Sequence, residues 1–418
     1  MSKRQLAMVM DLNKCIGCQT CTTACKTQWT NRNGREYMYW NNVETAPGQG
    51  YPRKWEESGG GFDAAGNLKP GRIPDVEQDY GAPFELNYEN ALNPRANGAP
   101  PSVGGAQPHL SPVSLPKNGP NWDEDQGEGE YPNSYYFYLP RMCNHCTKPS
   151  CLAACPRQAI YKREQDGIVL IDQERCRGYQ HCVAACPYKK IYYNPVFKRS
   201  EKCIFCYPRI EQGLPPACAN QCVGRLRFVS FLDDEEGPVH KLVTKWKVAL
   251  PLHAEMGTQP NVYYVPPLSP PKYDAQGRLT KERRIPDQYL IGLFGPEVPR
   301  VLKVLEQERE KKRKGEESEL MDILIAYRHA EMFKLDTAYY QKLGGASPPA
   351  KAVASSPCGL PDALDSPIAP QAHAAAMASS PAGRSLRVIP IVAFKKETLE
   401  DKLNNLEVAA GNWPGTAA

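Results

Sequence analysis

The cysteines are the residues in this sequence whose type and spacing could do chemistry. The chain has 418 residues and 16 cysteines, and all but one cysteine fall in four short runs, at 15–25, 143–155, 176–186 and 203–222. Clustered thiolates bind metals, whereas disulfide frameworks are typical of small secreted chains. The opening residues MSKRQLAMVMDLNKC contain no apolar signal-peptide segment, so we expect metal ligands rather than disulfides.

The spacing of the first run indicates iron–sulfur chemistry. In Cys15-x2-Cys18-x2-Cys21-x3-Cys25, three thiolates hold one iron–sulfur cube and the fourth reaches another cube. We expect the fourth cysteine to begin a helix and to face away from the first three. Residues 156–175 read as two strands joined by a Gln-Asp-Gly turn, the connection of a two-cluster ferredoxin module. The second run therefore pairs with the third, and the first with the fourth.

This pairing predicts four cluster sites. Three sites have four thiolates each and are expected to hold 4Fe–4S clusters: site I (Cys15, Cys18, Cys21, Cys222), site II (Cys25, Cys203, Cys206, Cys218) and site III (Cys143, Cys146, Cys151, Cys186). Site IV has three thiolates, Cys155, Cys176 and Cys182. Cys358 remains outside these sets, in a Pro- and Ser-rich stretch, and is expected to be an inert or exposed thiol.

Site IV lacks one ligand because Tyr179 stands where the third run would have its second cysteine. A phenol with an ordinary pKa of about 10 is a poor iron ligand at neutral pH. Three thiolates suit a 3Fe–4S cluster with the tyrosine at the vacant corner and tuning the cluster. A 4Fe–4S cluster with Tyr179 or water on one iron is the alternative. A zinc-stabilised structural or regulatory protein is the alternative of another class, although fifteen ligands do not divide into sets of four.

Other polar residues near the runs have supporting roles. His145 and His181 lie inside the cluster loops and are expected to hydrogen-bond to a cluster or to solvent, because the thiolates already complete the ligand count. Basic residues flank the runs and are expected to offset the negative charge of the clusters: Lys14, Lys26, Arg177, Lys189, Lys190 and Lys202. No catalytic residues are predicted, because no dinucleotide fingerprint or catalytic motif is present.

The sequence between and after the runs predicts an α+β protein with two ferredoxin-like 4Fe–4S modules, long loop insertions and a helical C-terminal region. The aromatic-rich stretch 29–55 is expected to be ordered, whereas 58–133, rich in Gly, Pro, Asn and Ser, is expected to form long loops around a neighbour, with disorder as the alternative. RFVSF and NVYYVPP predict strands. Helical periodicity appears in two sets: Val298, Val301, Leu302 and Leu305, then Leu320, Ile323, Leu324 and Tyr327.

The expected domain boundaries follow from this pattern. Residues 345–383 are rich in Ala, Pro and Ser and read as a linker, followed by a tail that could dock on a partner. The segments are 1–28 and 199–230 (two halves of ferredoxin module A), 136–198 (ferredoxin module B), 29–135 (insertion), 231–344 (strands and helices) and 345–418 (linker and tail).

Composition excludes two classes of function. The formal net charge is +5 without a long block of one sign, so charge does not indicate a nucleic-acid binder. The longest apolar runs are far shorter than the roughly 20 residues of a membrane span, so no direct membrane span is expected.

The four runs in this order, with an aromatic residue in place of one cysteine, resemble the iron–sulfur beta subunits of the dimethyl sulfoxide reductase family of molybdenum enzymes. The resemblance covers roughly residues 5–335. GREYMYWNNVETAPGQGYP resembles the branch of nitrate reductase, nitrite oxidoreductase, selenate and chlorate reductases, dimethyl sulfide dehydrogenase and ethylbenzene dehydrogenase. SGGGFD and ELMDILIAYRHAEMFKLD slightly favour the ethylbenzene-type, hydrocarbon dehydrogenase end of that branch.

The resemblance implies an electron-transfer subunit in a complex of three chains. A catalytic alpha subunit carries the molybdopterin cofactor, a gamma subunit carries haem b, and the beta subunit relays electrons between them, with module B toward the haem. A beta subunit of a respiratory nitrate reductase or nitrite oxidoreductase is the alternative. The location implied is the periplasm, by co-export with the alpha subunit, or alternatively the cytoplasmic face of the membrane.

Overall fold

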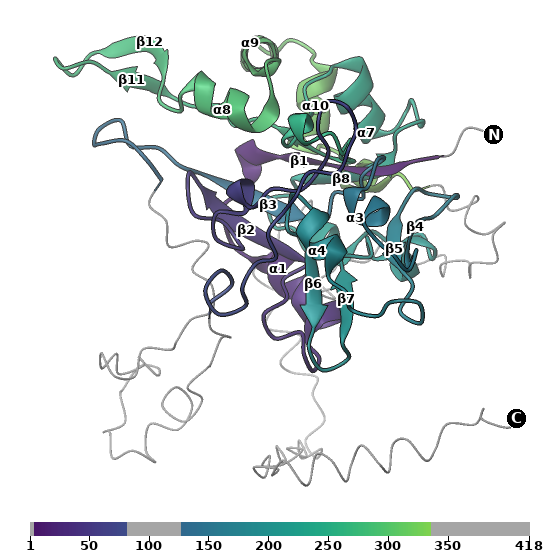
Figure 1. Ribbon diagram of the computed structural model, residues 1–418. Coiled ribbons are helices and arrows are strands. Elements are labelled where there is room, and N and C mark those ends of the chain that lie inside the picture. Colours follow the sequence, from purple (N-terminus) through teal and green to yellow (C-terminus); the bar gives the residue numbers. More distant parts are fainter. Residues whose placement is uncertain (1–3, 82–126, 336–418) are drawn as a thin grey trace, which may run out of the picture. The chain divides into compact units, whose positions relative to one another are not determined.

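A computed structural model describes residues 4–81 and 127–335. These residues belong to one compact unit, Met1–Val353, while a second unit, Ala354–Ala418, lies outside the described residues together with Cys358 and the expected linker and tail. Helices and strands are mixed throughout, as the α+β expectation requires (Figure 1). No helix among the described residues has the length and apolar character to cross a membrane.

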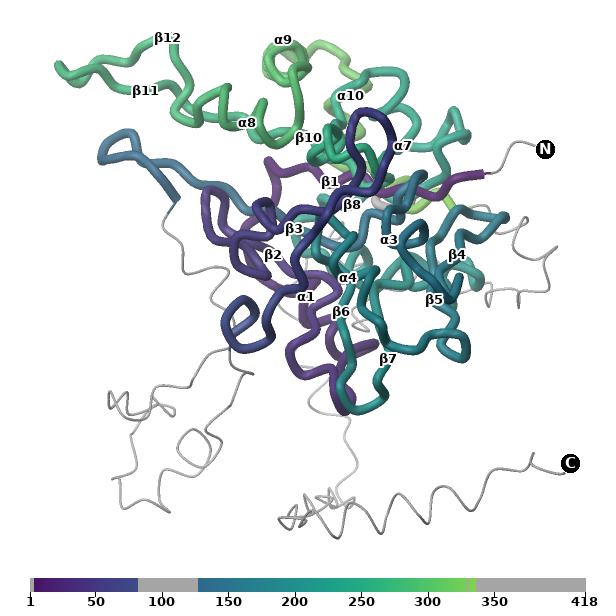
Figure 2. The backbone as a smooth tube through the Cα atoms, in the orientation of Figure 1, coloured from purple at the N-terminus to yellow at the C-terminus, as the bar shows by residue number. Residues whose placement is uncertain are grey.

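The central sheet joins the start of the chain to its middle. Its strand order is β8 (Arg227–Phe231), β1 (Leu6–Asp11), β10 (Val262–Val265) and β9 (Leu250–Pro251). β1 is antiparallel to β8 and parallel to β10, and all six of its residues are buried, because LAMVMD is apolar up to its last position. Figure 2 shows β1 and β8 side by side despite their separation in sequence. The strands expected at RFVSF and NVYYVPP are confirmed.

The aromatic insertion is anchored by a second strand pair. β2 (Asn41–Ala46) is antiparallel to β3 (Phe137–Met142), from Asn41 opposite Met142 to Ala46 opposite Phe137. Tyr37, Trp40 and Tyr51 beside this pair are buried, so the expected order of 29–55 is confirmed. Residues 59–81 form loops with isolated β-bridges, and 82–126 lie outside the described residues.

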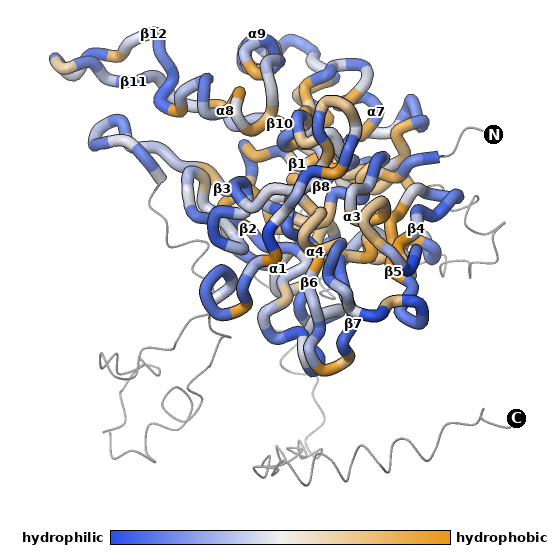
Figure 3. The backbone as a smooth tube through the Cα atoms, viewed as in Figure 1, coloured by the Kyte–Doolittle hydropathy of each residue, from blue (hydrophilic) through white to orange (hydrophobic). Residues whose placement is uncertain are grey.

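Three hairpins complete the strands. β4 (Ile160–Lys162) and β5 (Val169–Ile171) confirm the expected pair around the Gln-Asp-Gly turn. The other two hairpins were not expected: β6 (Ile191–Asn194) with β7 (Arg199–Lys202), and β11 (Pro271–Tyr273) with β12 (Leu279–Arg283). Figure 3 shows that β11 and β12 are largely hydrophilic, whereas apolar residues gather around β1, β8 and β10.

The cysteine runs form short helices: α1 (Thr20–Cys25), α3 (Ser150–Ala153), α4 (His181–Ala185), α5 (Tyr207–Ile210) and α6 (Ala217–Asn220). The expectation that the fourth cysteine begins a helix is wrong. Cys25 ends α1, and Cys186 caps the C-terminus of α4 in an extended conformation. The helix begins earlier because the preceding cysteine, Cys21 in α1 and Cys182 in α4, already lies inside it.

The C-terminal region is helical, as expected. It contains α7 (Pro238–His240), α8 (Asp287–Phe294), α9 (Val298–Arg313) and α10 (Glu319–Ile325). The periodic residues of α9 are buried, but the extension of the second helix to Tyr327 is wrong. Ala326 adopts a left-handed conformation that ends α10, which leaves Tyr327 81% exposed. Single turns of 3-10 or π-helix lie at Leu12–Lys14, Lys26–Thr30, Trp55–Ser58, Lys241–Lys245, Ala254–Met256 and His329–Phe333.

Candidate metal centres

The four cysteines predicted for site III line one cavity. Cys143 and Cys146 follow β3, Cys151 lies in α3, and Cys186 comes from the far end of α4. The rest of the lining has both apolar and polar side chains, the polar ones being Asn144, His145, Ser150, Tyr188 and Lys190. A cavity with four thiols in its wall fits a buried cluster with four thiolate ligands.

The four cysteines predicted for site I line a second cavity. Cys15, Cys18 and Cys21 come from the first run, and Cys222 comes from the end of the fourth run. Cys18 is exposed, whereas Cys21 is buried. The chain therefore brings Cys222 to the first run, and the pairing of β1 with β8 explains how, because β8 begins shortly after Cys222.

The site II cysteines also converge. Burial raises the pKa of the Cys25 thiol well above its ordinary value, and the neighbouring thiols of Cys203, Cys218 and Cys206 raise it further. Helices α1 and α6 pack against each other and carry Cys25 and Cys218. Neutral thiols are therefore the resting state without iron, and binding a cluster must release their protons.

The three thiols predicted for site IV lie close enough to interact. Burial raises the pKa of Cys182 to about 11, and the thiols of Cys176 and Cys155 add to this shift. Tyr179 lies on the loop before α4 with 58% of its surface exposed. His181 is exposed, and its ring centroid lies 6.5 Å from that of Tyr179, so its expected hydrogen bond to a cluster or to solvent stays a prediction.

Cysteines of successive sites lie close enough to interact electrostatically, which shows which sites are neighbours. Cys218 of site II interacts with Cys21 and Cys222 of site I. Cys203 of site II interacts with Cys143 of site III. Site III in turn reaches site IV through Cys186 and Cys182. The order I–II–III–IV results.

Hydrogen bonds to sulfur stabilise the charged thiolate form. The Trp29 indole Nε1 donates to Cys206 Sγ at 3.1 Å. Backbone N–H groups donate to three further sulfurs: Ala159 to Cys155 at 3.3 Å, Phe205 to Cys203 at 3.3 Å and Ser200 to Cys176 at 3.4 Å. Such donors are among the features that set the potential of an iron–sulfur cluster.

His145 lies against site III as expected for a supporting residue. The ring is 1% exposed, and its Nδ1 accepts the Val169 N–H at 3.1 Å. Burial and the charges of Lys202 and Lys162 lower the pKa of His145 well below its ordinary value, so the ring is neutral with its proton on Nε2. Nε2 has no hydrogen-bond partner among the described residues, and the ring lines the site III cavity.

The flanking basic residues lie in different surroundings. Burial lowers the pKa of Lys189 to about 8, while the Cys186 thiol opposes that shift. Lys190 is fully buried and interacts with Cys186 and Cys25, between sites III and II. Lys14 interacts with Cys222, Lys26 with Cys25, and Lys202 with Cys151 and Cys203. Arg177 is exposed and donates to the Glu174 and Cys176 carbonyls.

Sequence reasoning missed Arg227. This residue of β8 lines the site I cavity and its Nη2 donates to Cys21 Sγ at 3.3 Å. Although burial alone would lower the pKa of its guanidinium, the thiols of Cys21, Cys218 and Cys222 raise that pKa above its ordinary value. The available signal was an arginine within an otherwise apolar strand, RFVSF, shortly after the fourth run.

All fifteen cysteines of the described chain are free thiols. Within residues 4–81 and 127–335, no three His, Cys, Asp or Glu side chains form a group suited to a single metal ion. The mixed fold and the thiol-lined cavities define an iron–sulfur protein with ferredoxin-like domains. The 4Fe-4S binding domain family matches residues 6–27, and the 4Fe-4S dicluster domain family matches residues 134–231.

Curated relatives match most of the chain. The beta subunit of dimethylsulfide dehydrogenase from Rhodovulum sulfidophilum is 64% identical over 335 residues, covering 80% of this chain and 100% of the relative. The selenate reductase beta subunit from Thauera selenatis is 56% identical, covering 80% and 99%. The respiratory nitrate reductase beta subunit from Haloferax mediterranei is 60% identical, covering 79% and 94%.

The chain belongs to the iron–sulfur, electron-transfer beta subunits of the dimethyl sulfoxide reductase family of molybdenum enzymes. The resemblance drawn from the cysteine runs is therefore confirmed. The preference for an ethylbenzene-type complex is not supported, because these relatives are named for dimethylsulfide, selenate and nitrate.

Proposed function

We propose that the chain carries three 4Fe–4S clusters, at sites I, II and III, and one 3Fe–4S cluster, at site IV. Bound clusters would supply one-electron steps between a molybdopterin catalytic alpha subunit and a haem b gamma subunit or another redox partner. The observation that carries the proposal is the convergence of the fifteen thiols into the four sets expected from the crossing of the runs. In this proposal, ferredoxin module A (1–28 and 199–230) holds sites I and II, and ferredoxin module B (136–198) holds sites III and IV.

The linear order of the sites supports a path for electrons through the whole chain. Helix α1 carries Cys21 of site I and Cys25 of site II one turn apart, so one short helix links two sites. Cys182 and Cys186 at the two ends of α4 link site IV to site III in the same way. The link between the two modules passes from Cys203 to Cys143.

The two ends of the line differ in surroundings, and each is suited to a partner. At site I, Cys18 is exposed and Ile16 and Val223 are 63% and 64% exposed. At site IV, Tyr179 is exposed. Exposed apolar residues in one place are typical of protein interfaces. We assign the site I end to the catalytic subunit and the site IV end to the haem subunit, in line with the family resemblance.

Two alternatives remain distinct from this proposal. A respiratory nitrate reductase or nitrite oxidoreductase complex would use the same four sites, and the Haloferax mediterranei relative carries the nitrate reductase name. A zinc-stabilised structural protein would need tetrahedral sites of four ligands each. The 4Fe-4S family matches at both module positions favour iron.

For the location, we propose the periplasm, reached by co-export with the alpha subunit, with the cytoplasmic face of the membrane as the alternative. The family resemblance supports this location. Protease protection of this chain in intact spheroplasts is the test. Digestion by added protease is expected in the periplasmic case, and protection until the membrane is lysed contradicts it.

Metal and sulfide analysis of the intact complex, prepared without oxygen, tests the cluster assignment. After subtraction of the iron and sulfide of the partner subunits, about fifteen iron atoms and about sixteen sulfides are expected for this chain. Cys358→Ser is the matched control and should leave the iron content unchanged, because the other fifteen cysteines complete the four sets. Zinc in place of iron, or about eight iron atoms, would contradict the four-cluster proposal.

A further inference from the structure

Arg227 is a buried charge without a carboxylate partner. Its residue surface is 1% exposed, and among the described residues no Asp or Glu forms an ion pair with it. The comparably buried Arg141 differs, because it pairs with Glu44 at 2.6 Å. An uncompensated charge in a protein interior is strongly unfavourable. Arg227 therefore requires another source of negative charge close by.

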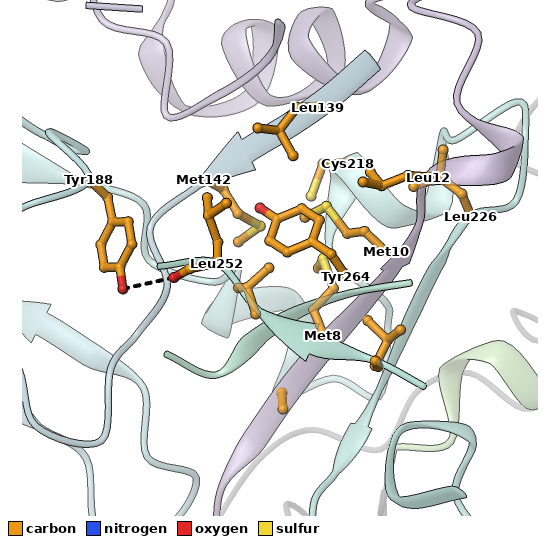
Figure 4. Packing of buried hydrophobic residues seen from close by; sticks show 14 of the residues in the cluster. Met8, Met10, Leu12, Leu139, Met142, Tyr188, Cys218, Leu226, Leu252 and Tyr264 are labelled. Atoms are coloured by element: carbon orange, nitrogen blue, oxygen red, sulfur yellow. Dashed lines mark hydrogen bonds between the residues drawn. The ribbon is translucent and has the colours of Figure 1, made fainter. Parts of the chain in front are cut away.

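The contacts of its guanidinium point to sulfur. Nη2 donates to Asn41 Oδ1 at 2.8 Å and to Cys21 Sγ at 3.3 Å. Nη1 faces the thioether sulfurs of Met8 and Met142 at 3.8 Å and 3.9 Å. Figure 4 shows these two methionines beside the Tyr264 ring and near Cys218.

The cysteines within electrostatic reach belong to two different sites. Cys21, Cys222 and Cys15 are predicted ligands of site I, and Cys218 is a predicted ligand of site II. Nε of Arg227 has no hydrogen-bond partner among the described residues. The guanidinium thus contacts Cys21 of site I directly and lies near the Cys218 thiol of site II.

We propose that Arg227 is the shared counter-charge of sites I and II, a positioning residue whose fixed positive charge raises the reduction potentials of both clusters. A nearby positive charge stabilises the form of a cluster that has gained an electron. This inference rests on the proposed cluster assignment. An arginine suits the position because Nη2 alone donates to both Asn41 and Cys21, Nη1 faces the methionine sulfurs, and the guanidinium keeps its charge when buried.

Two substitutions change the charge in independent ways. Arg227→Met removes the charge and places a thioether among Met8 and Met142. Asn41→Asp keeps Arg227 but gives it a carboxylate of its own at the present Oδ1 position. Asn41 Nδ2 has no hydrogen-bond partner among the described residues, so this change breaks no bond there. Arg227→Lys keeps the positive charge but replaces the planar guanidinium with an ammonium group.

Redox titration of the intact complex, followed by electron paramagnetic resonance, is the measurement. Arg227→Met and Asn41→Asp should each lower two of the four potentials of this chain, with at least a tenfold loss in the reduction equilibrium constant, about 59 mV for one electron. Arg227→Lys should give less than half of that shift. Arg225→Gln, a matched exposed arginine in the same segment, should leave all four unchanged.

The outcomes separate this inference from the cluster assignment. Three results would overturn the role of Arg227. They are unchanged reduction potentials in Arg227→Met, equal shifts in all four clusters, and a shift in Arg227→Lys as large as that in Arg227→Met. If the Arg227→Met complex fails to assemble, the Asn41→Asp variant tests the proposal instead. Unchanged reduction potentials in Asn41→Asp would overturn the role of Arg227. A wild-type iron content far below about fifteen would instead refute the cluster assignment.

Discussion

Tyr179 is the single residue that distinguishes site IV from the other three sites. Its position in the third run was apparent from the spacing alone, because the neighbouring cysteines follow the ferredoxin pattern. Its exposure depends on the folded loop before α4 and had to come from the structure. With one thiolate fewer, site IV carries less negative charge, which favours the reduced form.

Tyr179→Cys should convert the cluster at site IV. A fourth thiolate allows a fourth iron to bind and lowers the reduction potential, so the isotropic resonance of an oxidised three-iron cluster should largely disappear. Low-temperature electron paramagnetic resonance of the oxidised complex is the measurement. Tyr179→Phe is the control and should keep the signal. A wild-type complex without that signal would contradict the three-iron assignment and favour four irons with an oxygen ligand.

Sequence predicts ligands better than it predicts their surroundings. The cysteine sets follow from local spacing and the crossing rule, so they could be proposed before any fold was known. Arg227 could not, because its contact with Cys21 depends on β8 lying against β1. The indole donor Trp29 likewise reaches Cys206 only through the folded approach of residues far apart in sequence.

At the scale of elements, the pair β2–β3 holds the insertion to module B through one buried ion pair. Arg141 and Glu44 are 1% and 3% exposed, and two nitrogens of Arg141 bind the carboxylate at 2.6 Å and 2.7 Å. Burial alone would raise the pKa of Glu44, but the Arg141 charge lowers it overall. This pairing across a long insertion had no local sequence signal.

Arg141→Met should destabilise the chain by about 3–5 kcal/mol, because it leaves the Glu44 carboxylate buried without its partner. Denaturant-induced loss of structure, monitored by circular dichroism under anaerobic conditions, is the measurement. Arg300→Met is the control, since Arg300 is 42% exposed and pairs with the exposed Glu297. Exposed pairs contribute only about 0–1 kcal/mol. Equal effects of the two substitutions would contradict the account.

His253 joins the insertion to the C-terminal region in a pH-dependent way. Its ring nitrogens lie 2.8 Å from Glu56 and 2.7 Å from Glu255. Burial alone would lower the pKa of His253, but the two carboxylates raise it overall. A raised folded pKa gives stabilisation that is complete below the unfolded value, about 6.5, and is lost as the pH rises through the folded pKa.

Hydrogen exchange at residues 55–62 should therefore accelerate as the pH rises through the folded pKa of His253, after correction for the intrinsic pH dependence of exchange. His253→Gln should abolish this extra dependence, because glutamine does not titrate. Exchange at the β4–β5 hairpin serves as the internal control and should show no such step. A wild-type profile identical to that of His253→Gln would show that the bridge does not stabilise the insertion.

At the scale of the whole molecule, the sequence predicted the pairing of the first run with the fourth, although residues 26–202 lie between them. Cys222 lines one cavity with the cysteines of the first run, and cluster chemistry explains such an approach because it requires the crossing. The order of all four sites could not be predicted, since the approach of Cys203 to Cys143 depends on how the two modules pack. The end of α10 at Ala326 also escaped prediction, because a left-handed alanine has no distinctive signal.

The central claim is that electrons pass through the four sites in a single line. Its most direct test is to remove the cluster of site II with Cys206→Ser in the intact complex, reduce from the haem side, and follow each cluster by rapid-freeze electron paramagnetic resonance. Cys18→Ser at the end of the line is the control, in which sites II, III and IV should all be reduced. In Cys206→Ser, the account predicts that sites IV and III are reduced at the wild-type rate while site I stays oxidised. Reduction of site I at the wild-type rate would contradict the linear path.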